Sequence, residues 1–264
     1  MNLQLNGKVA LVTGSTVGIG FAIAKSLHDE GTEVILNGRS KDRVKEARER
    51  LRDSASPAAV HELVADLTTD GGVRILQEQF PAVDILVNNL GVYEAKPLSE
   101  ITPEDWERMF SVNVVSGARL SQLYLPKMKA KGAGRVLFIA SESGVNIPPD
   151  MIHYGVSKAA QIALARGLAE TTAGTGVTVN TVLPGPTYSE GVDRFLKDVI
   201  GSQAGDRSKI ESEFLTRMRP TSLIRRFATA EEVASLVTYL ASPLSSATNG
   251  AALRVEGGLL RGVL

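Results

Sequence analysis

The sequence predicts an α/β fold, a doubly wound parallel sheet of about seven strands with helices on both faces. Short apolar runs rich in β-branched residues alternate with longer segments of helical periodicity along the 264-residue chain. The apolar runs are continuous and do not alternate with polar residues, which is typical of strands buried on both faces. Together these observations favour successive strand–helix units that build one layer of parallel strands.

The elements follow one another with few breaks. The first strand, at residues 9–13, is the run Val-Ala-Leu-Val-Thr, and a glycine-containing turn joins it to a helix over 18–30. The second strand, at 33–37, leads into a charged and therefore exposed helix at 41–53. Further strands are predicted at 60–65, 85–88, 136–140, 177–182 and 253–255, and further helices at 103–131, 154–173 and 229–241.

The composition indicates one soluble domain, residues 1–264, without a metal site. Hydrophobic residues make up 43% of the chain, and 29 basic side chains balance 29 acidic ones, so nothing points to nucleic acid or an anionic membrane as a partner. The lack of cysteine excludes disulfides, iron–sulfur clusters and cysteine-ligated zinc, and the 3 histidines are far apart. Because the start does not resemble a signal peptide and no apolar run approaches the ~20 residues of a membrane span, we expect a cytoplasmic protein.

A glycine loop lies between the first strand and the first helix. Residues 13–20 read Thr-Gly-Ser-Thr-Val-Gly-Ile-Gly, a Gly-x3-Gly-x-Gly spacing rather than the usual Gly-x-Gly-x-x-Gly. Glycines let the backbone turn tightly beside a pyrophosphate, which the helix N-terminus then binds with free N–H groups. An ordinary strand–helix turn has the same appearance, but the place in the first strand–helix–strand unit favours a dinucleotide. The candidate contacts are Gly14, Ser15, Thr16, Gly18, Ile19 and Gly20.

The end of the second strand indicates which dinucleotide is bound. An NAD site needs an acid here to hold the ribose hydroxyls. The chain has Asn37 and Gly38 instead, followed by Arg39 and Ser40. A guanidinium can bind a ribose 2′-phosphate through two hydrogen bonds, so we predict that NADP(H) is favoured over NAD(H). The alternative is a solvated arginine at a strand end.

Polar residues also follow the third and fourth strands. Asp66, before Leu67, could accept a hydrogen bond from adenine, and the segment containing Asn89 and Gly91 could approach the adenine ribose. Each alone is compatible with a simple turn. Ligands of open parallel sheets bind at the carboxyl ends of the strands, and all these positions fall there.

Tyr154 and Lys158 are the strongest catalytic candidates. They are four residues apart and therefore lie on one face of the helix predicted at 154–173. A free tyrosine has a pKa near ~10, and moving it to about 7 requires roughly 4 kcal/mol. An ammonium about 4–5 Å away supplies on the order of 3–4 kcal/mol at an effective dielectric of about 20. The pair therefore predicts proton transfer near neutral pH, while an exposed helical pair without function is the plain alternative.

Two further polar residues complete the candidate catalytic set. Ser141 directly follows the strand at 136–140 and could hydrogen-bond a substrate carbonyl, or simply cap a turn. Asn113 lies in an apolar helical stretch, where a buried amide must be paired. It could hold a water that leads to Lys158, or satisfy a packed helix.

With these residues in this order, the chain resembles the short-chain dehydrogenase/reductase family over nearly its whole length. The residues that carry the resemblance are the glycine loop, Asp66, the segment 88–91, Asn113, Ser141, Tyr154 with Lys158, and Pro184 with Gly185. The resemblance implies a Rossmann-type fold and carbonyl/alcohol interconversion with NAD(P).

The resemblance also implies a role for each matching position. Tyr154 would be the general acid in reduction and the base in oxidation. Lys158 would lower the pKa of Tyr154 and hold the nicotinamide ribose, Ser141 would orient the carbonyl, and Asn113 would anchor a proton-relay water. Pro184, Gly185, Thr187 and Ser189 would contact the nicotinamide carboxamide.

The family's variable substrate lid corresponds to residues 188–226, which fit no core element and include the polar stretch 201–212. We expect an apolar helical lid here. The candidate pocket residues, Val92, Glu142, Asn146, Ile147, Met151 and Tyr188, are too mixed to name a substrate.

Two alternatives and an assembly state stay open. A 3-oxoacyl-[acyl-carrier-protein] reductase would use Lys127, Lys129, Lys131, Arg135 and Arg166 as a basic dock, although these residues also suit a solvated helix end. A non-catalytic dinucleotide-binding sensor or scaffold would need no Tyr154–Lys158 pair. The family commonly forms tetramers, so we expect a homotetramer, with the apolar tail 259–264 buried between subunits.

Overall fold

The computed structural model describes all residues except 53, 55, 190–206 and 264. Its centre is a seven-stranded sheet in the order β3-β2-β1-β4-β5-β6-β7, in which every pairing is parallel. The strands are β1 (Val9–Val12), β2 (Glu33–Gly38), β3 (Val60–Val64), β4 (Ile85–Asn88), β5 (Gly134–Ile139), β6 (Val177–Pro184) and β7 (Ala252–Val255). All seven predicted strands are present, and the α/β fold class is confirmed.

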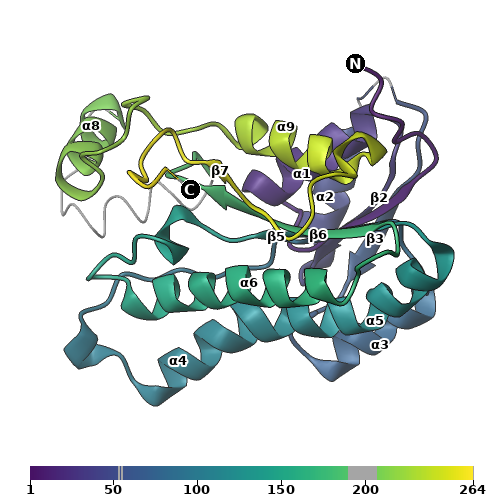
Figure 1. Ribbon diagram of the computed structural model, residues 1–264, viewed down its shortest axis with the longest axis horizontal. Coiled ribbons are helices and arrows are strands. Elements are labelled where there is room, and N and C mark those ends of the chain that lie inside the picture. Colours follow the sequence, from purple (N-terminus) through teal and green to yellow (C-terminus); the bar gives the residue numbers. More distant parts are fainter. Residues whose placement is uncertain (53, 55, 190–206, 264) are drawn as a thin grey trace.

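Helices cover both faces of the sheet (Figure 1). One layer holds α1 (Gly18–Asp29), α2 (Lys41–Arg52) and α9 (Ala230–Ala241). The other holds α3 (Asp70–Gln79), α4 (Pro103–Phe110), α5 (Ser116–Lys131) and α6 (Ile152–Glu170), and α8 (Arg207–Met218) lies beyond one end of the sheet in Figure 1. Short turns of helix occur at η1 (Leu98–Glu100), η3 (Glu142–Gly144) and η4 (Pro243–Ser245).

Each helical layer buries its own apolar core against the sheet. On the α1/α9 side, Ile23, Leu27 and Val237 pack on the strands without measurable exposure. On the α5/α6 side, Tyr124 and Leu120 are 0% and 1% exposed. Burying a side chain of this size contributes about 1.5–3 kcal/mol, so the two cores hold the sheet rigid and fix the positions of its strand ends.

Helix α3 was not predicted from the sequence. Two glycines, Gly71 and Gly72, stand in its first turn and hide the helical signal. Thr69 caps the helix by accepting a hydrogen bond from Gly72 N at 3.1 Å. A Cβ on Gly72 would lie 1.9 Å from the carbonyl oxygen of Asp66, so packing against the β3 exit requires glycine there.

The long helix predicted at 103–131 is interrupted. The segment η2 (Ser111–Val115) is one turn of π-helix between α4 and α5, and Asn113 lies within it. Single π-turns inside helices are frequent at functional sites, because the extra residue changes where the side chains point. The predicted start of the C-terminal helix is confirmed, because Thr229 and Glu232 form a reciprocal capping box there.

Within the part of the chain that the structure describes, no helix has the length and apolar character needed to cross a membrane. The same residues contain no cluster of three or more acidic or histidine side chains that could hold a metal ion.

Candidate active site

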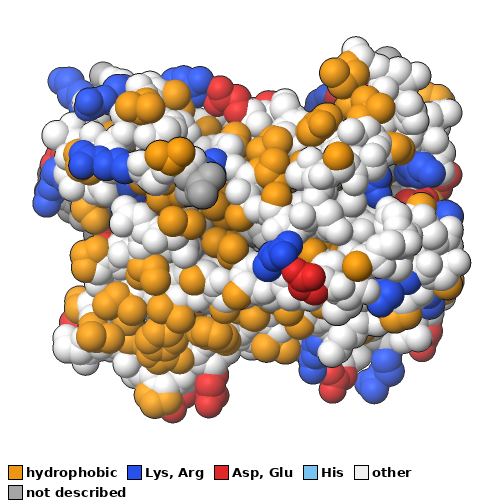
Figure 2. Space-filling model, viewed as in Figure 1, with side chains coloured by type: hydrophobic (Ala, Val, Ile, Leu, Met, Phe, Trp, Pro, Cys, Tyr) orange, Lys and Arg blue, Asp and Glu red, His pale blue; other side chains and the backbone are white. Residues whose placement is uncertain are grey.

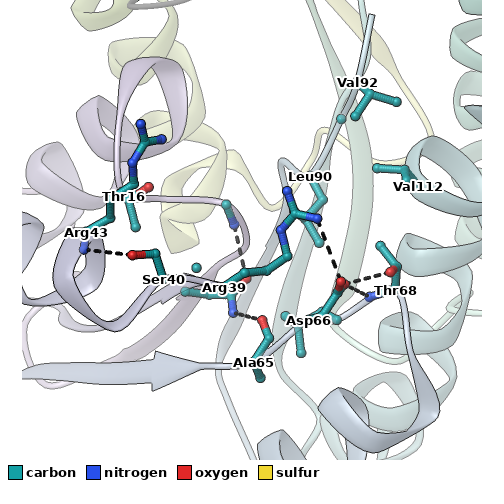
Figure 3. A pocket seen from close by; sticks show the side chains of 15 residues that line it. Thr16, Arg39, Ser40, Arg43, Ala65, Asp66, Thr68, Leu90, Val92 and Val112 are labelled. Atoms are coloured by element: carbon teal, nitrogen blue, oxygen red, sulfur yellow. Dashed lines mark hydrogen bonds and ion pairs between the residues drawn. The ribbon is translucent and has the colours of Figure 1, made fainter.

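Three neighbouring cavities lie at the carboxyl ends of the strands. The largest, about 530 Å³, is bordered by the ends of β2 and β3 and is drawn in Figure 3. The second, about 350 Å³, lies between the glycine loop and Tyr154, and we call it the central cavity. The third, about 120 Å³, shares Tyr93, Ser141 and Tyr154 with the central cavity. An elongated ligand could therefore lie across the first two cavities and meet a second molecule in the third.

The glycine loop has the backbone shape that a pyrophosphate site needs. Gly14 and Gly18 have φ values of 60° and 58°, a region that residues with a Cβ rarely adopt. Helix α1 begins after Val17 without a side-chain cap, whereas α3, α4 and α9 each have a threonine cap. The first N–H groups of α1 therefore remain available to an anion.

Side chains from two strands hold this loop in place. Asn89 Nδ2 donates to the carbonyl oxygens of Thr13 and Gly14 at 2.9 and 3.1 Å. Asn37 accepts from Gly14 N at 3.2 Å and donates to the β3 end. Ser15 is fully buried and accepts a hydrogen bond from Asn37 N at 2.9 Å. Ser15 thus supports the loop and lines none of the three cavities, while Gly14, Thr16, Gly18, Ile19 and Gly20 all line one.

Two arginines border the first cavity. Arg39 is 81% exposed, and its Nη1 lies 3.9 Å from Asp66 Oδ2 (Figure 3). Arg43 lines the same cavity and was not predicted. The signal was its place in the first turn of α2, the helix that begins directly after the β2 end carrying Arg39. Figure 3 shows Ser40 between the two arginines, with its hydroxyl bonded to Arg43 N.

Asp66 is held as a carboxylate at the far wall of this cavity. Its Oδ1 accepts hydrogen bonds from the Thr68 backbone and hydroxyl at 3.0 and 2.6 Å. Hydrogen bonding by Thr68, with a smaller contribution from the Arg39 charge, holds the pKa of Asp66 below its ordinary value. Leu67 lines the same cavity, as predicted.

Tyr154, Ser141 and Lys158 converge where the central and third cavities meet. Ser141 follows β5 and hydrogen-bonds the Tyr154 side chain, and both residues line the two cavities. Lys158 lies one turn along α6, with its Nζ 5.8 Å from the centre of the Tyr154 ring. The sequence-predicted triad is therefore assembled by two elements, the β5 end and the first turns of α6.

The prediction that Lys158 lowers the pKa of Tyr154 is not what the structure shows. Burial raises the pKa of Tyr154 to about 12, against a smaller lowering by the Ser141 hydrogen bond. Burial lowers the pKa of Lys158 to about 7. The lysine Nζ donates to Ile139 O and Gln161 Oε1, both at 2.9 Å, so its interactions are with these acceptors rather than with the phenol oxygen.

Gln161 was missed in the sequence because it is one polar residue in an apolar helical stretch. It is 1% exposed, and among the described residues it supplies the side-chain acceptor for Lys158. An ammonium has three N–H donors, and two are used by Ile139 O and Gln161. One donor therefore remains for a ligand in the central cavity, which Lys158 lines.

Asn113 is fully buried and its amide is occupied by protein groups. Its Oδ1 accepts from Val92 N at 2.8 Å, and its Nδ2 donates to Val92 O and Ser157 Oγ at 3.0 and 2.9 Å. These bonds connect the π-turn, the segment after β4 and helix α6. A Cβ placed on Gly91 would lie 3.4 Å from Lys158 Nζ and 3.6 Å from Asn113 Oδ1, so the lysine and the amide both adjoin this glycine. The water-relay role of Asn113 stays a prediction.

The segment after β6 lies along the central cavity. Pro184, Gly185, Thr187 and Ser189 all line it, as expected from the sequence. Thr187 donates its hydroxyl proton to Gly185 O at 2.9 Å, and Ser189 hydrogen-bonds Tyr93. Both residues thus line the central cavity, and their contact with the nicotinamide carboxamide stays a prediction.

The third cavity contains an ion pair, Glu142 with Arg219, that the sequence did not reveal. Glu142 and Met151 line it, as predicted, together with Phe214, Phe227 and Arg219. Of the other predicted pocket residues, Val92 lines the first two cavities, and Asn146 lines a separate cavity beside the C-terminal tail. Ile147 is 40% exposed, and Tyr188 packs on Phe227.

Of the predicted lid, the structure describes residues 188, 189 and 207–226, and residues 190–206 lie outside the described part. Helix α8 contributes Phe214 and Leu215, each 5% exposed, to a small cluster with Phe227. Helix α8 is thus apolar on one face, as expected of the lid, whereas residues 219–226 are not helical.

One other prediction needs correction, and a second loses part of its basis. Arg135 cannot belong to a surface dock, because it is 8% exposed and donates to the carbonyl oxygens of Ser242, Gly134 and Gly176. In the tail, Leu259 and Leu260 are already 2% and 9% exposed within the single chain, so their burial does not require a second subunit. Glu256 holds this tail by accepting from the backbone N–H groups of both leucines.

The fold and this site define an oxidoreductase that uses a nicotinamide dinucleotide, and comparison with known proteins identifies the family. The family model described as short chain dehydrogenase matches residues 8–199, so the chain belongs to the short-chain dehydrogenase family, which uses NAD(P).

The relatives support the same class. The chain is 47% identical to the uncharacterized oxidoreductase YvaG of Bacillus subtilis (strain 168), over 100% of both chains. It is 31% identical to D-beta-hydroxybutyrate dehydrogenase of Rhizobium meliloti (strain 1021), covering 95% of this chain and 98% of the relative. L-sorbose reductase from Gluconobacter frateurii, solved with NADPH and L-sorbose, matches with a TM-score of 0.92 and 30% identity over 100% of both chains.

Proposed function

We propose that the protein is an NADP(H)-dependent oxidoreductase that interconverts a carbonyl and an alcohol, with Tyr154 as the general acid and base. The observation that carries this proposal is the position of Tyr154 and Ser141, which line both the central cavity and the third cavity. A proton donor at that junction can reach a carbonyl oxygen in the third cavity while a dinucleotide lies in the other two.

The cofactor fits the residues that are present. The glycine loop and the uncapped N-terminus of α1 would hold the pyrophosphate, Arg39 and Arg43 the 2′-phosphate, and Lys158 the nicotinamide ribose. When bound, the nicotinamide supplies a hydride to the carbonyl carbon. Ser141 orients the carbonyl oxygen, and Tyr154 gives it a proton, so that an alcohol forms and the phenolate is later reprotonated.

The cofactor preference can be tested at Arg39. We expect NADPH to bind more tightly than NADH, because a guanidinium pairs with the extra phosphate. Arg39→Ala should weaken the binding of NADPH about 5–10-fold, a modest change because the side chain is exposed. The affinity for NADH should stay within about twofold of the wild-type value. Titration of cofactor fluorescence measures both affinities. Arg52→Ala, at the exposed end of α2, is the matched control and should change neither. Equal affinities for the two cofactors in the unmodified protein would contradict the preference.

We also propose a homotetramer. An apolar patch over the α4, α5 and α6 side supports this assembly (Figure 2). Val115, in η2 between α4 and α5, is 43% exposed. Packing of that face against a second copy would remove it from water. Light scattering at micromolar concentration should give the mass of four chains, and a monomer mass would contradict the assembly. The single catalytic domain and the cytoplasmic location stay predictions.

The experiment that tests the function is oxidation of NADPH with a panel of carbonyl compounds, read by nicotinamide absorbance. Turnover with any ketone or aldehyde supports the proposal. If acetoacetyl thioesters alone are reduced, the function narrows to a 3-oxoacyl-[acyl-carrier-protein] reductase. If the cofactor binds and no compound is reduced or oxidised, the protein is a sensor or scaffold and the proposal is wrong.

A further inference from the structure

The third cavity contains a buried ion pair next to the catalytic residues. Arg219 Nε donates to Glu142 Oε1 at 2.8 Å, and the two side chains are 9% and 3% exposed. Both residues line the cavity together with Ser141 and Tyr154. Glu142 follows Ser141 directly, and Arg219 follows helix α8. Any substrate that reaches Tyr154 therefore lies beside this pair.

The charge of Arg219 and three of its five N–H groups are already used within the protein. Besides Glu142, the guanidinium donates to Met218 O at 2.8 Å and faces Ser143 Oγ at 3.5 Å. A substrate carboxylate could gain Arg219 only by separating it from Glu142, which would leave a buried carboxylate without its counter-charge. The pair thus makes the cavity unfavourable for a second anion.

The two oxygens of the Glu142 carboxylate differ in their bonding. Oε1 accepts from Arg219 and also from Ser143 Oγ at 3.0 Å. Oε2 is buried and has no hydrogen-bond partner among the described residues. Burial raises the pKa of Glu142, and the nearby Glu256 carboxylate acts in the same direction. A buried acceptor without a donor is costly, so a ligand that offers an O–H group would be favoured over one that does not.

The rest of the cavity limits the ligand's size and character. Met151, Phe214 and Phe227 form apolar walls, and the volume is about 120 Å³. A cavity of about 150 Å³ is enough for a benzene molecule, so the substrate portion held here is compact. Apart from Ser141 and Tyr154, which serve the carbonyl, the described lining offers Glu142 Oε2 as a buried acceptor that still lacks a donor.

We propose that the Glu142–Arg219 pair makes the enzyme selective for compact, neutral ketones that carry a hydroxyl group close to the carbonyl, and unfavourable to keto acids. The inference rests on the carbonyl/alcohol function proposed above. Glu142 Oε2 accepts the substrate hydroxyl, and Glu142 already neutralises the charge of Arg219 that a substrate carboxylate would need.

Two sets of matched substrates test the inference. Hydroxyacetone, butanone and pyruvate share an acetyl group and differ only in what is bonded to its carbonyl carbon, which is a hydroxymethyl, an ethyl or a carboxylate group. 4-Hydroxy-2-butanone, 2-pentanone and acetoacetate repeat the comparison one carbon further away. In at least one set, we expect kcat/KM with NADPH to be higher for the hydroxyketone than for either of the other two compounds, by about tenfold or more. The reason is that the hydroxyketone alone donates a hydrogen bond to the charged Glu142 carboxylate.

Variants separate the two halves of the pair. Glu142→Gln frees the Arg219 charge and should raise kcat/KM for the keto acid relative to the hydroxyketone by about tenfold or more. The double variant Glu142→Leu/Arg219→Met removes both charges, which buried pairs tolerate well, and should lose the hydroxyl preference without gaining the acid. The control is Glu213→Gln/Arg217→Gln, an exposed pair on helix α8, which directly precedes Arg219, and it should keep the wild-type preference. Thermal unfolding of each variant verifies that it is folded.

The outcomes distinguish this inference from the function it rests on. If ketones are reduced but the plain ketone or keto acid matches the hydroxyketone in both sets, the selectivity is wrong and the oxidoreductase function stands. An unchanged preference in the double variant overturns the role of the pair. If no carbonyl compound of any kind is reduced, both the function and the inference are wrong.

Discussion

Tyr154→Phe is expected to lower kcat for carbonyl reduction by about 10²–10⁴-fold, the range that a positioned general acid contributes. The change removes one hydroxyl and keeps the ring, so the hydrogen bond to Ser141 is lost while the packing of α6 is retained. Steady-state kinetics with NADPH and the best ketone of the panel measure the effect. NADPH binding should change by less than about threefold, because the phenol is not proposed to hold the cofactor's phosphates.

Tyr124→Phe is the matched control for this variant. Tyr124 is fully buried, donates its hydroxyl to Phe80 O at 2.9 Å, and lines none of the three cavities. Loss of this hydroxyl should lower the free energy of unfolding by about 1 kcal/mol and leave kcat unchanged. Oxidoreductase activity that survives Tyr154→Phe at the wild-type rate would show that the proton comes from another group.

Lys158→Met should lower kcat/KM for NADPH by about 100-fold or more. It removes a buried cation beside Tyr154 and the donor proposed for the nicotinamide ribose. The effect should depend on pH. Burial lowers the pKa of Lys158 from its ordinary 10.5 to about 7, so the charged form is present below that pH and is lost as the pH rises through it.

In the wild-type protein, kcat/KM for NADPH should therefore fall as the pH rises, with an apparent pKa near that of Lys158. The pH dependence of kcat/KM reports the pKa values of groups in the free enzyme, so kcat/KM is the parameter to follow. The profile of Lys158→Met should be flat over the same range. Gln161→Leu removes the side-chain acceptor that favours the ammonium form, and it should shift the alkaline limb to lower pH. A wild-type profile that rises through this range would contradict the assignment.

Much of the fold was readable because the signals are local. Each strand end that matters for the site, such as Asn37, Asn89 and Ser141, follows an apolar run that can form little but a buried strand. The candidate catalytic residues could be found for the same reason, since Tyr154 and Lys158 occur on one helix and Ser141 directly after a strand. Helix α3 was missed because tertiary packing at Gly72, not helix propensity, determines its first turn.

What the sequence could not show depends on contacts between distant segments. Glu142 meets Arg219 from 77 positions away, and nothing local marks either residue as half of a pair. Whether the pKa of Tyr154 is raised or lowered also depends on contacts between distant segments. A helical spacing of four residues suggested that Lys158 acidifies the phenol, but burial affects both groups, and Gln161 and Ile139 bind the lysine.

The central claim is that a hydride passes to a carbonyl carbon next to Tyr154. It is tested most directly with NADPH in which both hydrogens on the reactive carbon of the nicotinamide ring are replaced by deuterium, incubated with the protein and a ketone that it reduces. Mass spectrometry of the alcohol should find one deuterium on the former carbonyl carbon, and the rate of label transfer should fall about 10²–10⁴-fold in Tyr154→Phe. Binding of NADPH without label in any product, or equal transfer by Tyr154→Phe, would contradict the proposed mechanism.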